Sequence, residues 1–148
     1  MIIHTSMWGE LDTPESQIYN FPKGIPGFEE EHQFALIDEE DSPFVYMQSL
    51  KQKHLTFVMA DPFLFYPDYE FDLPDTDAEE LCIDDAISVK CIITVREKIE
   101  ESSINLLAPL VFNPQQRLGK QVVLQGVPYR TSHRLWNDSV DENGRDGV

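Results

Sequence analysis

Residues 21–30, which read FPKGIPGFEE, are the stretch that decides how this chain folds. Proline fixes φ at about −65° and removes a backbone donor, whereas glycine tolerates positive φ. A segment that mixes the two with large apolar residues takes one bent path and clips those side chains into a core. We therefore expect Phe21 and Phe28 to be buried, and Gly24 or Gly27 to have positive φ. The segment holds no nucleophile, metal-ligand set or phosphate-binding loop, so it points to a binding protein.

A second stretch of the same character lies at residues 105–113, NLLAPLVFN. Asn105 and Asn113 bracket its apolar run, and asparagine readily hydrogen-bonds backbone groups and adopts turn conformations. The favoured interpretation is a buried edge strand whose two ends are capped by these asparagines. The alternative is a segment that contacts a partner, in which case Asn105 belongs to the interface.

Short β-type runs dominate the rest of the chain. They are rich in β-branched or aromatic residues, partly alternate, and recur about every ten residues. They lie at residues 33–37, 44–48, 55–60, 88–96 and 120–125. The pattern predicts a mainly β fold, a small antiparallel β-barrel with one short surface helix.

The helix is predicted at residues 76–81. Thr76 is placed to cap it, and Glu79 follows three residues later, which is the spacing of a capping box. Few of its residues are apolar, so the helix should lie on the surface. A further short turn is expected at residues 28–32.

Length and composition fit one domain followed by a tail. A chain of 148 residues, 41% of them hydrophobic, is large enough to bury a core. We expect a single β-barrel-like domain over residues 1–136 and a disordered acidic tail over residues 137–148, NDSVDENGRDGV. No apolar run approaches the roughly 20 residues of a membrane span. The first residues show no signal peptide, so the predicted location is the cytoplasm, without membrane association.

The formal net charge of −16 is the strongest signal in the bulk composition. It argues against direct binding of nucleic acid, because that binding draws its affinity from Lys and Arg on phosphates. It favours a basic partner, whose association an acidic surface steers. The alternative is that the acidity serves solubility alone.

The residue types that usually carry chemistry form no recognisable site. Cys82 and Cys91 are expected to be two buried thiols rather than a disulfide or part of a zinc site. The histidines are scattered, and the acidic runs at residues 38–41 and 84–85 suit solvated turns better than a cation site. The sequence therefore predicts no catalytic residue, no metal and no other cofactor.

The segment at residues 60–70, ADPFLFYPDYE, is the first candidate for a partner face. It holds more aromatic residues than one small core can accommodate, so some of them should be exposed beside the acids. The residues expected to contact a partner are Phe65, Tyr66, Asp68, Tyr69 and Glu70, together with Asn105 from the second stretch. The competing interpretation places Phe63, Phe65 and Phe71 in the core and leaves the tyrosines half-buried.

In their order and spacing, these stretches resemble the flagellar assembly factor FliW family over residues 1–136. Five further pieces carry the resemblance: SPF at 42–44, MQSL at 47–50, DPF at 61–63, PDYEFDL at 67–73 and KQVVL at 120–124. The resemblance implies a small β-barrel that regulates flagellum assembly and is not an enzyme.

The resemblance also implies two protein partners. A member of this family is expected to bind flagellin before export and, when free, to bind the RNA-binding translational repressor CsrA and relieve its block on flagellin synthesis. The resemblance implies an action beside the RNA site of the repressor, whereas the acidity alone suggests mimicry of RNA. Two other functions stay open: a flagellin export chaperone without a regulatory role, and a small β-barrel enzyme that uses paired carboxylates on a sugar or ester.

Overall fold

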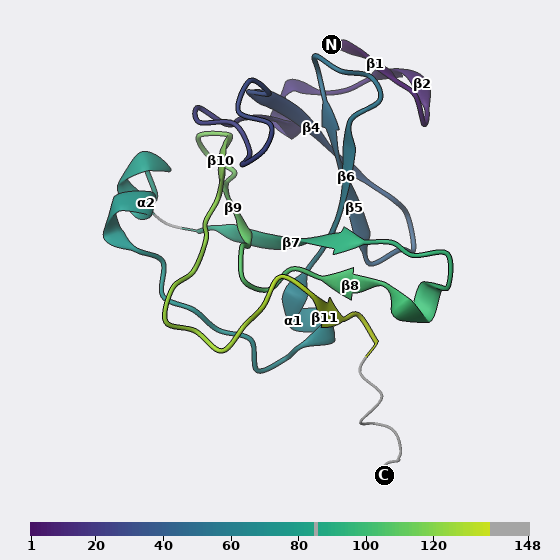
Figure 1. Cartoon of the computed structure of the whole chain (residues 1–148). Coiled ribbons are helices and arrows are strands. Elements are labelled where there is room, and N and C mark those ends of the chain that lie inside the picture. Colours follow the sequence, from purple (N-terminus) through teal and green to yellow (C-terminus); the bar gives the residue numbers. More distant parts are fainter. Residues whose placement is uncertain (85, 137–148) are drawn as a thin grey trace.

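The computed structural model describes residues 1–84 and 86–136 and consists mainly of β-strands (Figure 1). Within these residues seven strands close into a barrel in the order β7-β6-β5-β4-β3-β10-β9, and β9 pairs back onto β7. Their bounds are β3 (Ile18–Asn20), β4 (Gln33–Asp38), β5 (Phe44–Ser49), β6 (Thr56–Ala60), β7 (Ser88–Thr94), β9 (Leu110–Asn113) and β10 (Leu118–Gln121). Neighbours are antiparallel except β3 and β10, which meet in parallel. The predicted antiparallel barrel is thus confirmed, apart from that one pair.

Four further strands of the described residues lie outside the barrel. β8 (Ser103–Ile104) pairs with the end of β7, and β11 (His133–Arg134) pairs with β8. β1 (Ile2–Thr5) and β2 (Gly9–Asp12) form a separate hairpin. Single 3-10 turns occur at Glu15–Gln17 and Ile99–Glu101. β8 and β9 lie one after the other along the same side of β7, so the loop between them is held close to the sheet.

The last predicted strand is shifted relative to its sequence signal. The expectation was residues 120–125, but the strand β10 ends at Gln121. The chain beyond it still follows its neighbour, because the amide of Val122 donates to the carbonyl of Pro109 at 2.9 Å. Proline has no amide to donate in return, so a regular ladder ends there.

The centre of the barrel is built on the first Pro–Gly stretch. Phe21 is fully buried, as expected, and its ring makes edge-to-face contacts with Phe34 and Phe112 at centroid distances of 5.2 and 5.8 Å. Gly119 has to be glycine, because a Cβ there would lie 2.5 Å from the Phe21 ring. The expectation of positive φ is confirmed at both glycines of the stretch, with φ of 67° at Gly24 and 91° at Gly27.

Phe28 does not follow the expectation of burial. Its side chain is 40% exposed, and its ring lies edge-on against that of Phe57 on β6, with the ring centroids 5.4 Å apart. The turn through Gly27 brings residues 25 and 28 together in an antiparallel bridge, in which the amide of Phe28 donates to the carbonyl of Ile25 at 2.6 Å. Ile25 takes the inner position, with 2% exposure, and Phe28 is left on the outer side. The expected short turn after Gly27 is present at residues 29–30.

The described residues contain two short α-helices rather than the single one predicted. α1 (Pro62–Phe65) was missed, although Asp61 before Pro62 is a recognised start signal: its carboxylate accepts from the amide of Phe63 at 2.9 Å. α2 (Asp75–Glu80) lies where a helix was expected, but it begins after Pro74 and Thr76 does not cap it. None of the helices in the described part of the chain is long and apolar enough to cross a membrane.

The stretch at residues 105–113 ends in β9, and all four residues of this strand are buried. It is not an edge strand, because it lies between β10 and β7 in the barrel. Asn113 does cap its end: Oδ1 accepts from the amide of Gln115 at 3.1 Å, while Nδ2 donates to the carbonyls of Leu81 and Cys82. These last bonds attach the end of α2 to the barrel.

The two cysteines are free thiols, but only Cys91 is buried. Cys82 is exposed because the chain leaves α2 there with φ of 53°, which turns its side chain outward. The acidic run at residues 38–41 is exposed: Asp38 ends β4, and residues 40–41 form the turn, with Asp41 at φ of 60°. The expected tail over residues 137–148, and Asp85 of the expected turn at 84–85, lie outside the described residues.

Candidate functional site

An exposed apolar patch lies where α1 meets the start of β7. Phe63 is 43% exposed, Leu64 64% and Ile87 39%, although all three are large apolar side chains. We call these three residues the α1 patch. Asp61 and Lys90 line a shallow depression together with Phe63 and Ile87, and Leu64 follows Phe63 on α1. Large exposed apolar side chains that cluster, with charges at the edge, are typical of protein-binding surfaces.

Two of the predicted partner residues, Phe65 and Tyr66, are half-buried next to the α1 patch. The hydroxyl of Tyr66 donates to the backbone carbonyl of Arg134, and its ring packs edge-on against His133 at 5.6 Å. Burial raises the pKa of Tyr66, and the positive charge of Arg130 partly opposes this. Tyr66 therefore joins α1 to β11 and stays un-ionised near neutral pH.

The two acids of the predicted site, Asp68 and Glu70, are exposed, as a partner-facing role requires. The amide of Glu70 donates to the hydroxyl of Tyr129 at 3.1 Å, which fixes the backbone and leaves the carboxylate in solvent. Both acids lie on the same irregular segment as the half-buried aromatics. Their carboxylates therefore add negative charge to the surface of this segment.

Tyr69 does not belong to the surface, contrary to the expectation that it is exposed. It is 4% exposed, its hydroxyl donates to the carbonyl of Leu106 at 2.8 Å, and its ring lies 4.7 Å from that of Tyr129. Burial, with the neighbouring Cys91 thiol, raises its pKa. The turn after Pro67, closed by the Tyr69 amide on the Tyr66 carbonyl, directs the side chain inward. Tyr69 anchors the segment to the core.

The competing interpretation of this segment is also only partly right. It placed Phe63, Phe65 and Phe71 in the core, but Phe63 is exposed and the other two are half-buried. Cys91 lies beneath the segment, where burial raises the pKa of its thiol to about 12 although a hydrogen bond with Tyr69 favours ionisation. A thiol with so high a pKa is not a nucleophile at neutral pH.

Asn105 is half-buried in the loop between β8 and β9. Its Oδ1 accepts from the amides of Leu107 and Ala108 at 3.1 and 3.0 Å, so the carbonyl end of the side chain holds the loop. Its Nδ2 has no partner among residues 1–84 and 86–136. The fold brings this loop and the aromatic segment together, because Tyr69 binds the carbonyl of the adjacent Leu106.

The site offers shape and charge rather than reactive groups. Burial and the charge of Arg130 lower the pKa of His133, which is therefore neutral at pH 7. In the part of the chain that the structure describes, no three His, Cys, Asp or Glu side chains are placed to hold a metal ion. What the arrangement does chemically is to present apolar area beside carboxylates.

Comparison with known proteins gives a family to which this arrangement belongs. The family model described as FliW protein matches residues 2–135, which is nearly every described residue. The chain belongs to the FliW family. It is 44% identical over 142 residues to the flagellar assembly factor FliW of Bacillus subtilis (strain 168), covering 94% of this chain and 99% of that protein. The relative from Geobacillus sp. (strain WCH70) is 42% identical over 142 residues, with 95% and 99% covered.

The fold agrees with a solved structure of the same family. A crystal structure of the flagellar assembly factor FliW superposes with a TM-score of 0.87 at 40% identity, and the match covers 95% of this chain and all of that one. This FliW-family chain therefore has the family's barrel, and the resemblance inferred from the short stretches is confirmed. Its role in flagellar assembly follows from membership.

Sequence analysis missed Leu64, Ile87 and Tyr129 in this region of the FliW-family chain. Leu64 had a usable signal, since a one-turn helix that begins at Asp61-Pro62 cannot turn every apolar side chain inward. Ile87 and Tyr129 had none, because they are distant in sequence and meet the segment at residues 60–70 only through the folding of the barrel: Ile87 lies beside Phe63, and Tyr129 contacts Tyr69 and Glu70.

Proposed function

We propose that this FliW-family chain is a cytoplasmic, non-enzymatic partner-switching regulator. It binds flagellin before export and, when flagellin is absent, binds and antagonises a CsrA-type repressor, so that flagellin is synthesised again. Family membership supports the flagellar role. The observation that carries the protein-binding part is the α1 patch, an exposed apolar surface on a chain of net charge −16.

The α1 patch and its surroundings suit a basic protein better than a nucleic acid. Leu64 and Phe63 supply apolar area to bury, and Asp68 and Glu70 on the same segment supply orientation against Lys or Arg. A repressor that binds RNA must present a basic surface, so its charge complements this one. Phe65, Tyr66 and Asn105 remain proposed contributors at the edge of the patch, whereas Tyr69 acts through its anchoring role.

Binding of purified flagellin and purified CsrA to variants of this surface tests the proposal. Leu64→Ala removes an exposed side chain of the patch, and Asp68→Lys reverses a charge beside it. A true anchor costs about 2 kcal/mol of binding or more, roughly a thirtyfold loss of affinity. Ile99→Ala is the matched control, because Ile99 is 54% exposed on a turn outside the segment.

The outcomes separate the two partners. Loss of one partner only means distinct surfaces, and loss of both means a shared one. If Leu64→Ala and Asp68→Lys bind both partners as tightly as Ile99→Ala does, the α1 patch is not the binding surface. If the parent chain binds flagellin but not CsrA, the simpler export chaperone is correct and the regulatory role is refuted.

The alternative function, an enzyme that uses paired carboxylates, gains no support from the one group of acids that line a common depression in the described residues. Glu29, Glu30 and Glu31 line an open depression with Lys51. Glu31 is buried, and its carboxylate accepts from the Ser49 hydroxyl and from Nε2 of the Gln52 side chain. Glu29 accepts from the backbone amide of Gly27 at 3.0 Å. Glu29 and Glu31 are thus engaged in hydrogen bonds within the chain.

A further inference from the structure

The first residues of β7 have an unpaired side. β6 accompanies β7 only from Cys91 onward, because Ala60, the last residue of β6, is opposite Cys91. Ser88, Val89 and Lys90 pair with β9 on the other side of the strand. No strand of the described residues pairs with these three on the side that β6 leaves. We call this side of residues 88–90 the β7 edge.

Proline is the reason why β6 stops short of the β7 edge. Pro62 follows soon after the end of the strand, has no amide hydrogen to give to a ladder, and begins α1. The carboxylate of Asp61 accepts from the amide of Phe63, which starts the helix and turns the chain out of the sheet. The sequence itself therefore prevents β6 from covering the β7 edge.

The ladder bonds show which backbone groups point to the β7 edge. In an antiparallel sheet, successive residues direct their N–H and C=O to opposite neighbours. The carbonyl of Ile92 accepts from the amide of Asn105, so Ile92 faces the side of β8 and β9. Ser88 and Lys90 stand at even spacing from Ile92 and face that same side. Val89 faces the opposite side, where its N–H and C=O have no hydrogen-bond partner within residues 1–84 and 86–136.

Exposed apolar side chains lie along the β7 edge. A shallow depression of about 420 Å³ is lined by Asp61, Phe63 and residues 87–90. Phe63 and Ile87 belong to the α1 patch, and both are exposed. An unpaired backbone donor and acceptor at Val89 thus stand beside apolar area that is itself uncovered. A strand edge in this state is a template for pairing with another chain.

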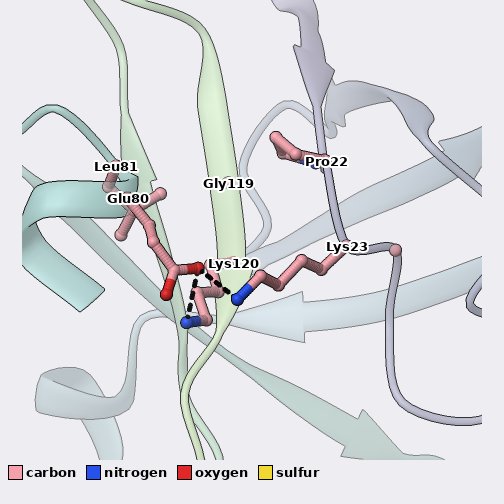
Figure 2. A pocket seen from close by; sticks show the side chains of 7 residues that line it. Pro22, Lys23, Glu80, Leu81, Gly119 and Lys120 are labelled. Atoms are coloured by element: carbon pink, nitrogen blue, oxygen red, sulfur yellow. Dashed lines mark hydrogen bonds and ion pairs between the residues drawn. The ribbon is translucent and has the colours of Figure 1, made fainter. Parts of the chain in front are cut away.

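A comparable gap at β10 is filled by the chain itself. β10 pairs with β3 at a single position. Beside it, Glu80 of α2 accepts from Lys120 of β10 at 2.9 Å and from Lys23 at 3.0 Å, as Figure 2 shows. These ion pairs hold α2 and the first Pro–Gly stretch against β10. Among the described residues nothing similar binds the backbone of Val89, so the β7 edge is open to another chain.

The β7 edge selects an extended backbone, and the charge of the chain selects a partner over a second copy. An added strand supplies main-chain hydrogen bonds, while its alternate side chains contact the surface and give specificity. A second copy also carries a net charge of −16, so repulsion opposes edge-to-edge pairing of two copies. Asp61 and Lys90 offset each other in the depression, so attraction of a basic segment acts through the chain as a whole.

We propose that a partner of the α1 patch binds by adding a strand to the β7 edge. The added segment is extended, with apolar residues at alternate positions that cover Phe63 and Ile87, and with Lys or Arg near its ends. One of its residues exchanges two backbone hydrogen bonds with Val89. This inference rests on the proposed function, because it assigns a binding mode to the same patch.

Amide exchange and shifts of the ¹⁵N-labelled full chain test the β7 edge. In the free chain the Val89 amide should exchange faster than those of Ser88 and Lys90, which the ladder with β9 protects. The probe is the capped peptide acetyl-Lys-Val-Leu-Val-Lys-amide. It should shift the Val89 amide and, near saturation, slow its exchange about tenfold or more. No shift at Val89 up to the solubility limit of the probe overturns the proposal.

Two N-methylated probes separate strand pairing from apolar contact alone. One carries the methyl group on the amide of the central Leu, and the other on the amide of the following Val. Their side chains are identical, but in a strand only one of these two amides points to β7. One methylated probe should therefore bind like the parent peptide, and the other should lose about tenfold in affinity. Equal affinity of the two methylated probes overturns the proposal.

Val89→Pro removes the free amide without removing a bond to β9, because that amide points the other way. It should abolish binding of the probe, whereas the matched variant Val89→Ala keeps the amide and should retain binding. Thermal melts check that both variants fold, and the methylated probes carry the test if Val89→Pro does not. Protection of Val89 that rises with the concentration of the chain itself, without probe, assigns the β7 edge to a second copy and overturns the proposal.

Purified flagellin and CsrA distinguish this inference from the proposed function. If a partner binds Val89→Pro as tightly as the parent chain and leaves the Val89 amide unprotected, strand addition is refuted while the proposed function stands. If neither partner binds the parent chain, the proposed function is refuted, and the peptide probes still decide whether the β7 edge accepts a strand.

Discussion

Phe21 and Phe28 lie in the same short stretch, but only Phe21 is buried in the core. The stability losses caused by Phe21→Ala and by Phe28→Ala therefore compare a core side chain with a surface side chain. Phe21 is fully buried and makes edge-to-face contacts with Phe34 and Phe112. Truncation of Phe21 to alanine leaves a cavity in the core. Gly119, which lies against the Phe21 ring, has no side chain that could fill this cavity. The cost expected for a buried Phe→Ala change is about 3–5 kcal/mol.

Phe28 is the internal control for this experiment. It is 40% exposed and contacts one ring, that of Phe57, so water replaces the lost side chain and no sealed cavity forms. We expect Phe28→Ala to cost about 1–2 kcal/mol, well below the full cost of a buried ring. At about 2–4 °C per kcal/mol for a chain of this size, Phe21→Ala lowers Tm by roughly 6–20 °C, and Phe28→Ala by about 2–8 °C.

Urea unfolding followed by tryptophan fluorescence, together with thermal melts, measures both variants. The slope of the free energy of unfolding against urea should match that of the parent, so that the midpoints report stability alone. Equal destabilisation by the two substitutions refutes the assignment of Phe28 to the outer side of the bridge. A stability of Phe21→Ala close to the parent's refutes the central place of Phe21 in the barrel.

Three further predictions follow from the packing and the charges. Gly119→Ala should cost about 1–3 kcal/mol by overpacking against Phe21; urea unfolding at the parent's midpoint would contradict the contact. The carboxyl of Glu80 has a folded-state pKa below its ordinary value of 4.5. Its contribution to stability is therefore fully present above pH 4.5 and is lost as the pH falls through the folded-state pKa. The fall in Tm between about pH 7 and pH 3 should be smaller in Glu80→Gln than in the parent. Association with the basic repressor should be faster at low ionic strength, where the screening length is about 30 Å, than at physiological ionic strength, where it is about 8 Å. If the association rate measured by stopped flow does not depend on salt, the net charge of −16 serves solubility alone.

Much of the fold was predictable because its signals are local. The runs at residues 33–37, 44–48 and 88–96 became strands with nearly the expected bounds, since β-branched residues restrict the backbone wherever they lie. The positive φ at Gly24 and Gly27 was likewise predictable, because the flanking prolines leave few other paths. The family could also be inferred from the order of the short motifs.

The site was less predictable, because exposure depends on which distant segment covers a residue. Tyr69 and Phe63 stand six residues apart in one aromatic segment, yet the first is buried and the second is exposed. The difference comes from Leu106 and Tyr129, which receive Tyr69 from other parts of the chain. The local turn after Pro67 directs Tyr69 inward, but only these distant residues cover it.

The amino-acid sequence alone thus determined the β character, the bent path of the first Pro–Gly stretch, the acidity and the family. The tertiary structure decided that Phe28 and Cys82 face outward and that β9 lies inside a closed barrel. The physical reason is the range of the forces involved. Backbone preferences act within a few residues, whereas burial is settled only when strands far apart in sequence close the barrel and fill its core.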